Sequence, residues 1–267
     1  MDFSITEEQS AIKDVIARFI ENEYDFEKRM KIAESDSAYD KEVYNFFVEQ
    51  GFTAIPFSEE DGGLNGGPVE TMLIMKEIGR GLVLEPFLEN IMLAGGILKR
   101  LANQHQKDEW LNKIINGEMQ STLAFTEPQS RFQLNDVATT ANKKEGNFIL
   151  NGKKSFVLNG SESDLIIVPA RTSGSQTDVK GITLFALKKD SAGIEMNSYK
   201  SVDGRSAAEI KLNNVSVSSD SIIGEIDNGY DALEATVDEA TLAICAEATG
   251  IMKSLHDKTV EYSKNRV

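Results

Sequence analysis

The spacing of apolar residues changes twice along this chain, and this double change limits the folds that the sequence can adopt. Before about residue 120, apolar residues recur at helical intervals, as Val43, Phe46 and Phe47 do. From Gln120 the pattern changes to short runs of β type, and after Gly229 it is helical again. We therefore predict a strand-rich segment between two helical blocks.

Glycine and proline mark the expected helix boundaries in the first block. Pro68 and Pro86 fit the first turns of two helices, because a proline there loses no hydrogen bond. Gly51 is expected to end the helix over about 41–50. Gly79 and Gly81 are expected to break the helix that Pro68 begins.

Short apolar runs separated by turn residues fill the middle of the chain. The runs lie at 148–150, 165–168, 182–187 and 208–212. The turn signals include Asn151-Gly152, Asn159-Gly160 and Asp203-Gly204. Evenly spaced short strands of this kind predict a small antiparallel barrel or sandwich.

The charge balance excludes one class of partner. The chain has 28 Lys and Arg against 43 Asp and Glu, a formal net charge of −15. A protein that binds phosphate backbones needs a basic stripe, and none is visible, so we expect no nucleic-acid partner. Because no run of about 18 apolar residues occurs, we also expect no membrane span.

Cysteine usage and the first residues indicate the compartment. Cys245 is the single cysteine, so no internal disulfide forms, which is typical of a reducing environment. The first eight residues are acidic and lack the basic and apolar segments of a signal peptide. We therefore expect a cytoplasmic protein.

No metal centre or hydrolytic triad is predicted. His105 and His256 lie on separate helical segments, and neither has a second ligand three or four residues away. No serine or cysteine triad is evident. Lys143, Lys144, Lys153 and Lys154 are expected to be surface charges beside turns between strands.

The last residues lie inside a helical pattern that has no cap. A single helix after the sheet segment would leave an apolar face uncovered. We therefore expect either a truncated chain or a dependence on a partner chain.

Several short motifs occur in the order found in one enzyme family. They are PFSEEDGG at 56–63, EIGRG at 77–81, FTEP at 125–128, NGKK at 151–154, NG at 159–160 and YSKNR at 262–266. Together they resemble the acyl-CoA dehydrogenase superfamily over essentially the whole chain. Within it, EPQSRF at 127–132, VDGRSAA at 202–208 and CAEA at 245–248 look most similar to the small subunit of pimeloyl-CoA dehydrogenase.

The resemblance implies an α+β, multi-domain fold. We expect an N-terminal all-α domain over 1–118 and a middle antiparallel β-barrel over 119–225. Residues 226–267 would form the first helix of a C-terminal helical bundle, whose remaining helices we expect beyond Val267.

The resemblance also implies an activity. Enzymes of this family are FAD-dependent oxidoreductases of fatty acid metabolism. They introduce an α,β double bond into an acyl-CoA thioester by removal of the α-proton and transfer of the β-hydride to flavin N5. We expect an electron-transfer flavoprotein as electron acceptor and a homo- or hetero-oligomer, with a tetramer favoured. Relatives carry the catalytic base in the bundle beyond Val267, so no base is assigned here.

Five residues are expected to bind FAD by resemblance. The backbone of Phe125 and Thr126 would face the pyrimidine edge of the flavin, and the Thr126 hydroxyl would add a contact. Phe156 stands where relatives often have a tryptophan packed on the ring. Leu158 replaces a threonine that bonds the flavin near N5, so only its backbone remains polar. Arg266 matches an arginine that pairs with the pyrophosphate across a subunit interface.

Three residues are expected to bind substrate. Arg131 and Phe132 follow Pro128, where typical relatives have a glycine- and serine-rich turn, and Arg131 would meet a CoA phosphate. A solvated loop arginine is the alternative. Asp238 corresponds to a substrate-side aspartate in some relatives, although the arginine that often follows it is Thr241 here.

The sequence is compatible with three functions. The chain is an acyl-CoA dehydrogenase, possible substrates including dicarboxylyl-CoA thioesters, or it is a non-catalytic partner subunit of a heteromeric dehydrogenase. A flavin oxidase or monooxygenase of the same fold is the third alternative. Leu158 and the turn without glycine favour the partner subunit more than they would in a typical member.

Overall fold

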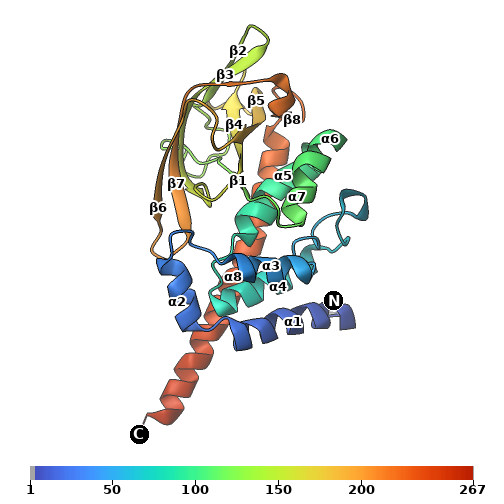
Figure 1. The fold of residues 1–267 in the computed structure, drawn as a ribbon, viewed down its shortest axis with the longest axis vertical. Coiled ribbons are helices and arrows are strands. Elements are labelled where there is room, and N and C mark those ends of the chain that lie inside the picture. Colours follow the sequence, from blue (N-terminus) through green and yellow to red (C-terminus); the bar gives the residue numbers. More distant parts are fainter. Residues whose placement is uncertain (1–3, 267) are drawn as a thin grey trace. The chain divides into compact units, whose positions relative to one another are not determined.

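The computed structural model describes residues 4–266, which form two compact units (Figure 1). The helical unit comprises the chain up to Glu85 together with the segment from Glu239, and the sheet unit comprises Pro86–Asp238. The predicted α+β fold class is confirmed, because helices come first, a sheet follows and a long helix comes last.

The helical unit is built around aromatic side chains. Its helices are α1 (Glu7–Glu23), α2 (Phe26–Glu34), α3 (Lys41–Glu49), α4 (Pro68–Gly81) and the later part of α8 (Tyr230–Asn265). The rings of Phe19 on α1 and Phe46 on α3 stack at 3.9 Å between centroids. Phe47 and Phe52 pack edge-on beside them and are almost fully buried. Such pairs add directional contacts to the burial of apolar area.

Glycines allow α4 and α8 to approach closely within this unit. A Cβ at Gly79 would lie 2.0 Å from the carbonyl oxygen of Glu247, and one at Gly250 would lie 1.9 Å from that of Lys76. Neither position therefore accepts a side chain. The expectation that Gly79 breaks the helix is wrong, because α4 continues to Gly81. Gly79 is needed for close packing of the two helices.

The sheet unit contains an eight-stranded sheet in the order β6-β7-β3-β2-β4-β5-β8, with β1 attached to β4. The strands are β1 (Ser121–Leu123), β2 (Thr140–Lys144), β3 (Asn147–Leu158), β4 (Leu165–Arg171), β5 (Ile182–Lys188), β6 (Ile194–Lys200), β7 (Ser206–Val217) and β8 (Ile222–Ile223). Most neighbours are antiparallel, whereas β1 and β2 pair with β4 in parallel. Within residues 4–266 no pairing joins β6 to β8, so the sheet keeps two edges.

Helical segments at the start of the sheet unit carry unusual hydrogen bonding. They are the π-helix η2 (Leu88–Gly95), α5 (Gly96–Leu101), α6 (Gln104–Gln106), the π-helix η3 (Lys107–Leu111) and α7 (Asn112–Ile115). The side chain of Asn90 on η2 accepts hydrogen bonds from the Ser121 N–H at 2.9 Å and from the Ser121 hydroxyl. This contact fixes η2 against β1.

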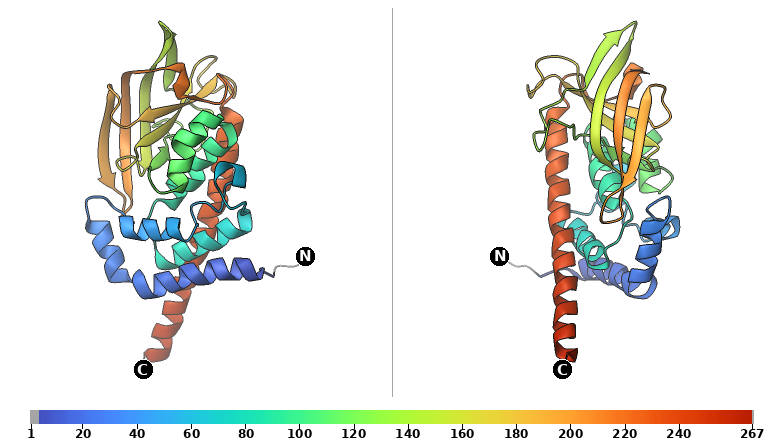
Figure 2. Two further views of the ribbon diagram at one scale, coloured as in Figure 1. Left: turned by 45° about the vertical axis from the view of Figure 1, so that its right-hand side comes forward. Right: turned by 90° about the vertical axis from the view of Figure 1, so that its left-hand side faces the viewer.

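The long strand β3 passes through a predicted turn. Asn151-Gly152 lies inside β3, where the register against β7 shifts between Leu150 and Gly152. A Cβ at Gly152 would lie 2.3 Å from the Thr139 hydroxyl oxygen. The glycine therefore serves a close approach, and the prediction of a turn here is wrong. In Figure 2, β3, β7 and β6 run side by side as long strands.

No helix in the described part of the chain is long and apolar enough to cross a membrane. The core of the sheet unit is mostly apolar. It contains Ala124, Phe148, Leu150, Val157, Ile166, Val168, Phe185, Leu187, Ile210, Leu212 and Val215 among others.

One carboxyl group in the helical unit is buried at an energetic cost. Glu85 is 3% exposed, and its Oε1 accepts the Asp40 N–H at 3.3 Å. Its Oε2 has no hydrogen-bond partner among the described residues. Burial raises the pKa of Glu85 from its ordinary 4.5 to about 7, because the charged form loses its solvation.

Replacement of Glu85 by glutamine is expected to flatten the pH dependence of stability. Between pH 4.5 and about 7 the native protein holds a proton that the unfolded chain releases, so stability falls as pH rises. The loss reaches about 3 kcal/mol above pH 7. Urea unfolding of Glu85→Gln at pH 5 and pH 8 should therefore show a gain relative to wild type that is larger at pH 8.

The exposed Glu42→Gln on α3 provides the matched control for this comparison. It should follow the wild-type stability at both pH values. An equal change at pH 5 and pH 8 in Glu85→Gln would show that Glu85 does not titrate in this range.

Candidate functional site

A buried ion pair anchors the turn that follows β1. Lys154 is 0% exposed, and its Nζ lies 2.6 Å from Glu127 Oε1 and 2.7 Å from the Pro169 carbonyl oxygen. Glu127 also accepts the backbone N–H groups of Ala138 and Thr139. The expectation that Lys154 is a surface charge is wrong, because Glu127 provides a partner inside the sheet unit.

The charge state of this pair follows from its surroundings. Burial tends to raise the pKa of Glu127, but Lys154 and several hydrogen-bond donors outweigh it, and the pKa falls below its usual value. Burial lowers the pKa of Lys154, and the adjacent carboxylate opposes that shift. A carboxylate with this many donors remains charged at neutral pH.

The same region brings Phe125 and Thr126 against β3. The Ser155 N–H donates to the Thr126 carbonyl oxygen at 2.9 Å, and the Thr122 hydroxyl donates to that of Leu158 at 2.6 Å. Residues 124–126 follow β1 without strand geometry of their own. Phe125 and Thr126 are both partly buried, so they lie at the edge of the sheet core.

A β-bulge presents Phe156. The register of β3 against β7 shifts between Lys154 and Val157, and Phe156 has φ +51°. Residues with a Cβ rarely adopt this left-handed region, and bulges of this kind redirect a side chain. Phe156 is 50% exposed, although it belongs to a strand of the core.

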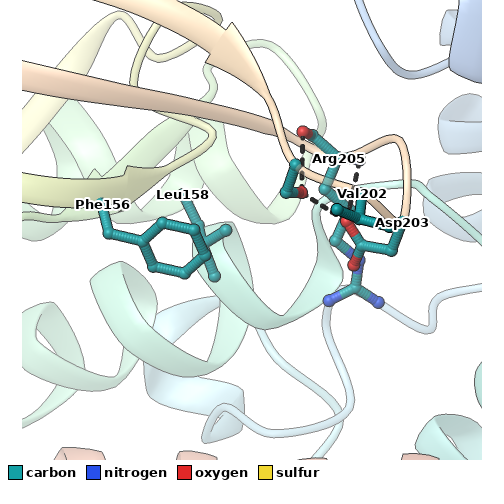
Figure 3. Close-up of a pocket in the computed structure, with 6 residues that line it drawn as sticks. Phe156, Leu158, Val202, Asp203 and Arg205 are labelled. Atoms are coloured by element: carbon teal, nitrogen blue, oxygen red, sulfur yellow. Dashed lines mark hydrogen bonds and ion pairs between the residues drawn. The ribbon is translucent and has the colours of Figure 1, made fainter.

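An open pocket of about 480 Å³ lies beside this bulge. Figure 3 shows Phe156 and Leu158 side by side, facing the turn between β6 and β7. The lining residues are Phe156, Leu158, Ser201, Val202, Asp203 and Arg205. Its apolar walls, with charged groups at one side, suit a flat ring system that carries polar substituents.

Arg205 supplies the positive charge of the pocket. Its Nη1 lies 3.9 Å from Glu89 Oε1, and its Nε lies 3.8 Å from Asp203 Oδ2. The Glu89 side chain belongs to the π-helix η2 and is 4% exposed. The guanidinium is therefore flanked by two carboxylates.

The turn residues of this pocket were not among the predicted site residues. The Asp203-Gly204 turn signal marks the hairpin, and Gly204 has φ +89°. Val202 is fully exposed at its tip. That this exposed hairpin lines the same pocket as Phe156 is evident only from the three-dimensional arrangement.

The remaining predicted residues are not among those that line this pocket. Arg131 (φ +49°) and Phe132 are exposed in the turn after Pro128, and Phe132 is 100% exposed. Asp238 is exposed on α8. Arg266 belongs to the helical unit, where its Cζ lies 5.9 Å from the centre of the Tyr262 ring. Their roles as ligands stay predictions.

Two family models match the chain. The acyl-CoA dehydrogenase N-terminal domain matches residues 6–118, and the acyl-CoA dehydrogenase middle domain matches residues 122–215.

Individual relatives and solved structures agree with these matches. The 3-(aryl)acrylate reductase of Clostridium sporogenes is 30% identical over 98% of this chain and 70% of its own length. Subunit CarC of the caffeyl-CoA reductase–Etf complex of Acetobacterium woodii is 26% identical over 98% of this chain and 70% of its own length. The structure of butyryl-CoA dehydrogenase from Megasphaera elsdenii has a TM-score of 0.89 at 26% identity, covering 100% of this chain and 71% of that one.

Loss of one partner of the buried ion pair is expected to destabilise the sheet unit strongly. Lys154→Met leaves the Glu127 carboxylate buried without its counter-ion, which costs about 3–5 kcal/mol. The double variant Glu127→Gln/Lys154→Met removes both charges and should recover most of this loss. The free energy of unfolding in urea measures both effects.

The neighbouring Lys153→Met is the matched control. Lys153 forms a half-exposed ion pair with Glu209 at 3.3 Å, so its loss should cost about 1 kcal/mol or less. Equal losses in Lys153→Met and Lys154→Met would contradict a special role of the buried pair.

Proposed function

This chain belongs to the acyl-CoA dehydrogenase family, and from this premise we propose that it is an FAD-dependent oxidoreductase of acyl-CoA thioesters. The reaction introduces an α,β double bond by loss of an α-proton and a β-hydride. The observation that carries the proposal is the pocket in which Phe156 and Leu158, both predicted as flavin contacts, face the β6–β7 turn. For this chemistry the protein supplies a proton acceptor and a pocket that contains little water.

The residues present fit a flavin. Phe156 offers a half-exposed aromatic face, and Leu158 and Val202 supply apolar contact for a planar ring. The backbone of Phe125 and Thr126 runs beside β3 and is proposed to contact the polar ring edge. When bound, FAD supplies the hydride acceptor.

The other proposed ligands follow the family resemblance. Arg266 is proposed to pair with the flavin pyrophosphate, and Arg131 with a CoA phosphate, because a guanidinium binds phosphate through two parallel hydrogen bonds. Phe132 and Asp238 are proposed to contact the substrate. The catalytic base is proposed to follow Val267.

Three further features belong to this proposal. The first is the narrower similarity to the small subunit of pimeloyl-CoA dehydrogenase, with acceptance of a dicarboxylyl-CoA thioester. The second is an oligomer, with a tetramer favoured, that acts in the cytoplasm with an electron-transfer flavoprotein. The Etf complex named for one relative supports that partner. The third is the domain division 1–118, 119–225 and 226–267, which the matches over 6–118 and 122–215 support.

A non-catalytic partner subunit is the second candidate function. Leu158 offers no side-chain hydrogen bond to a flavin, and its carbonyl oxygen already accepts the Thr122 hydroxyl. The turn 129–136 has no glycine that would allow a close backbone approach. Both features favour a chain that completes a site formed mainly by another subunit. A flavin oxidase or monooxygenase is the third candidate and has no specific support.

Anaerobic titration with acyl-CoA separates these functions. The protein is purified alone and together with a homologous partner subunit. Yellow protein whose flavin absorbance bleaches with acyl-CoA in the absence of oxygen supports the dehydrogenase. Colourless protein that becomes active only with the partner supports the second candidate. Protein that retains no flavin in either form contradicts the proposal.

Replacement of Leu158 by threonine is expected to speed flavin reduction. The added hydroxyl would provide a hydrogen bond beside the ring, which corresponds to a gain of about tenfold in rate. Anaerobic stopped-flow with acyl-CoA measures the change, and Leu158→Val, which has the same branched shape without the hydroxyl, is the control. Equal rates in the two variants would show that position 158 does not contact the reacting part of the flavin.

A further inference from the structure

The bulge that presents Phe156 is opposed by a single acidic residue. On β7, Ile210 pairs with Lys154 and Ala208 pairs with Val157. Glu209 therefore lies opposite both Ser155 and Phe156, so β3 has one extra residue here. Two residues against one is the arrangement of a β-bulge, and it leaves a backbone N–H without a partner in the ladder.

The Glu209 carboxylate fills that gap. Its Oε1 accepts the Phe156 N–H at 3.2 Å, and its Oε2 accepts the Ser155 hydroxyl at 3.0 Å. Lys153 Nζ lies 3.3 Å from the same Oε2, and the Tyr199 hydroxyl donates to Oε1 at 3.3 Å. One side chain thus binds the backbone of Phe156, the side chains of Ser155 and Lys153, and the side chain of Tyr199 on the edge strand β6.

These contacts hold a conformation that the backbone would otherwise leave. Phe156 has φ +51°, which a residue with a Cβ adopts only where its surroundings hold it. Burial tends to raise the pKa of Glu209, but the Phe156 N–H, the Ser155 hydroxyl and the Lys153 ammonium group outweigh it and lower the pKa. The group is therefore a carboxylate at neutral pH, and a carboxylate accepts stronger hydrogen bonds than a neutral side chain.

We propose that Glu209 is a positioning residue, whose carboxylate holds the 155–156 bulge and thereby sets the Phe156 ring as the aromatic wall of the pocket. The proposal rests on the proposed function in so far as the wall serves a flavin. Glu209 itself does not line the pocket and acts through Phe156.

Hydrogen exchange tests the bulge without any flavin. In Glu209→Ala the Phe156 amide loses its acceptor, so its exchange should accelerate by about tenfold or more in the folded protein. Glu195→Ala is the matched control, because Glu195 on β6 binds Lys211 and Asn213 on β7, which lie away from the bulge. An unchanged exchange rate for Phe156 in Glu209→Ala would overturn the proposal.

A double-mutant cycle tests the link to the flavin. Phe156→Ala removes the ring, and Glu209→Ala displaces it, so each should weaken FAD binding by about fivefold to tenfold. In the Phe156→Ala background, Glu209→Ala should then have no further effect, because the ring is already absent. FAD titration followed by flavin fluorescence gives the four dissociation constants.

The outcomes separate this proposal from the proposed function. Failure of the wild-type protein and its complex to bind FAD contradicts the function, while the exchange experiment still decides whether Glu209 holds the bulge. Effects on FAD binding that multiply in the double variant, or none in Glu209→Ala, overturn the positioning role. If Glu209→Ala does not fold, Glu209→Gln keeps the side-chain length with one acceptor oxygen, and the same cycle applies.

Discussion

The ion pair between Lys154 and Glu127 is the interaction on which the site depends. Its 2.6 Å contact joins the middle of β3 to the turn after β1, two segments that are far apart in the sequence. Both side chains are almost fully buried, so neither charge finds water if the other is absent. The pair therefore fixes which residues of the 124–127 segment lie against which residues of β3.

The ion pair also positions the pocket, because residues next to Lys154 in the sequence form one of its walls. Ser155, next to Lys154, donates its N–H to Thr126, next to Glu127. The bulge begins at the same place and directs Phe156 outward, while Leu158 completes the wall. A change in the buried pair thus affects the two predicted flavin-contacting segments together. Stability and binding are expected to depend on the same residues here, because they share one strand.

The fold class and two of the six residues that line the pocket could be predicted from sequence, and the rest could not for identifiable reasons. The change of apolar spacing indicates the sheet between helices, and the resemblance indicates Phe156 and Leu158. Lys154 is misread because a lysine after Asn-Gly is typical of a surface turn, and its burial depends on a carboxylate 27 positions away. The role of Glu209 depends on a register shift between strands, which no local pattern reveals.

The pocket chemistry bears on the choice between an active dehydrogenase and a partner subunit. The Leu158 side chain donates no hydrogen bond, and its carbonyl oxygen is bound to Thr122, so its contribution to a bound ring is apolar packing. Polar contacts to the ring are then left to residues 124–126, to Ser201, Asp203 and Arg205 of the pocket, or to another chain. Since the Thr126 carbonyl oxygen already accepts the Ser155 N–H and the Ala124 N–H already donates to the Ile167 carbonyl oxygen, the N–H groups of Phe125 and Thr126 remain the more important groups of that segment. An active enzyme therefore needs those backbone donors to face the ring edge, whereas a partner subunit needs only the Phe156 wall that Glu209 supports.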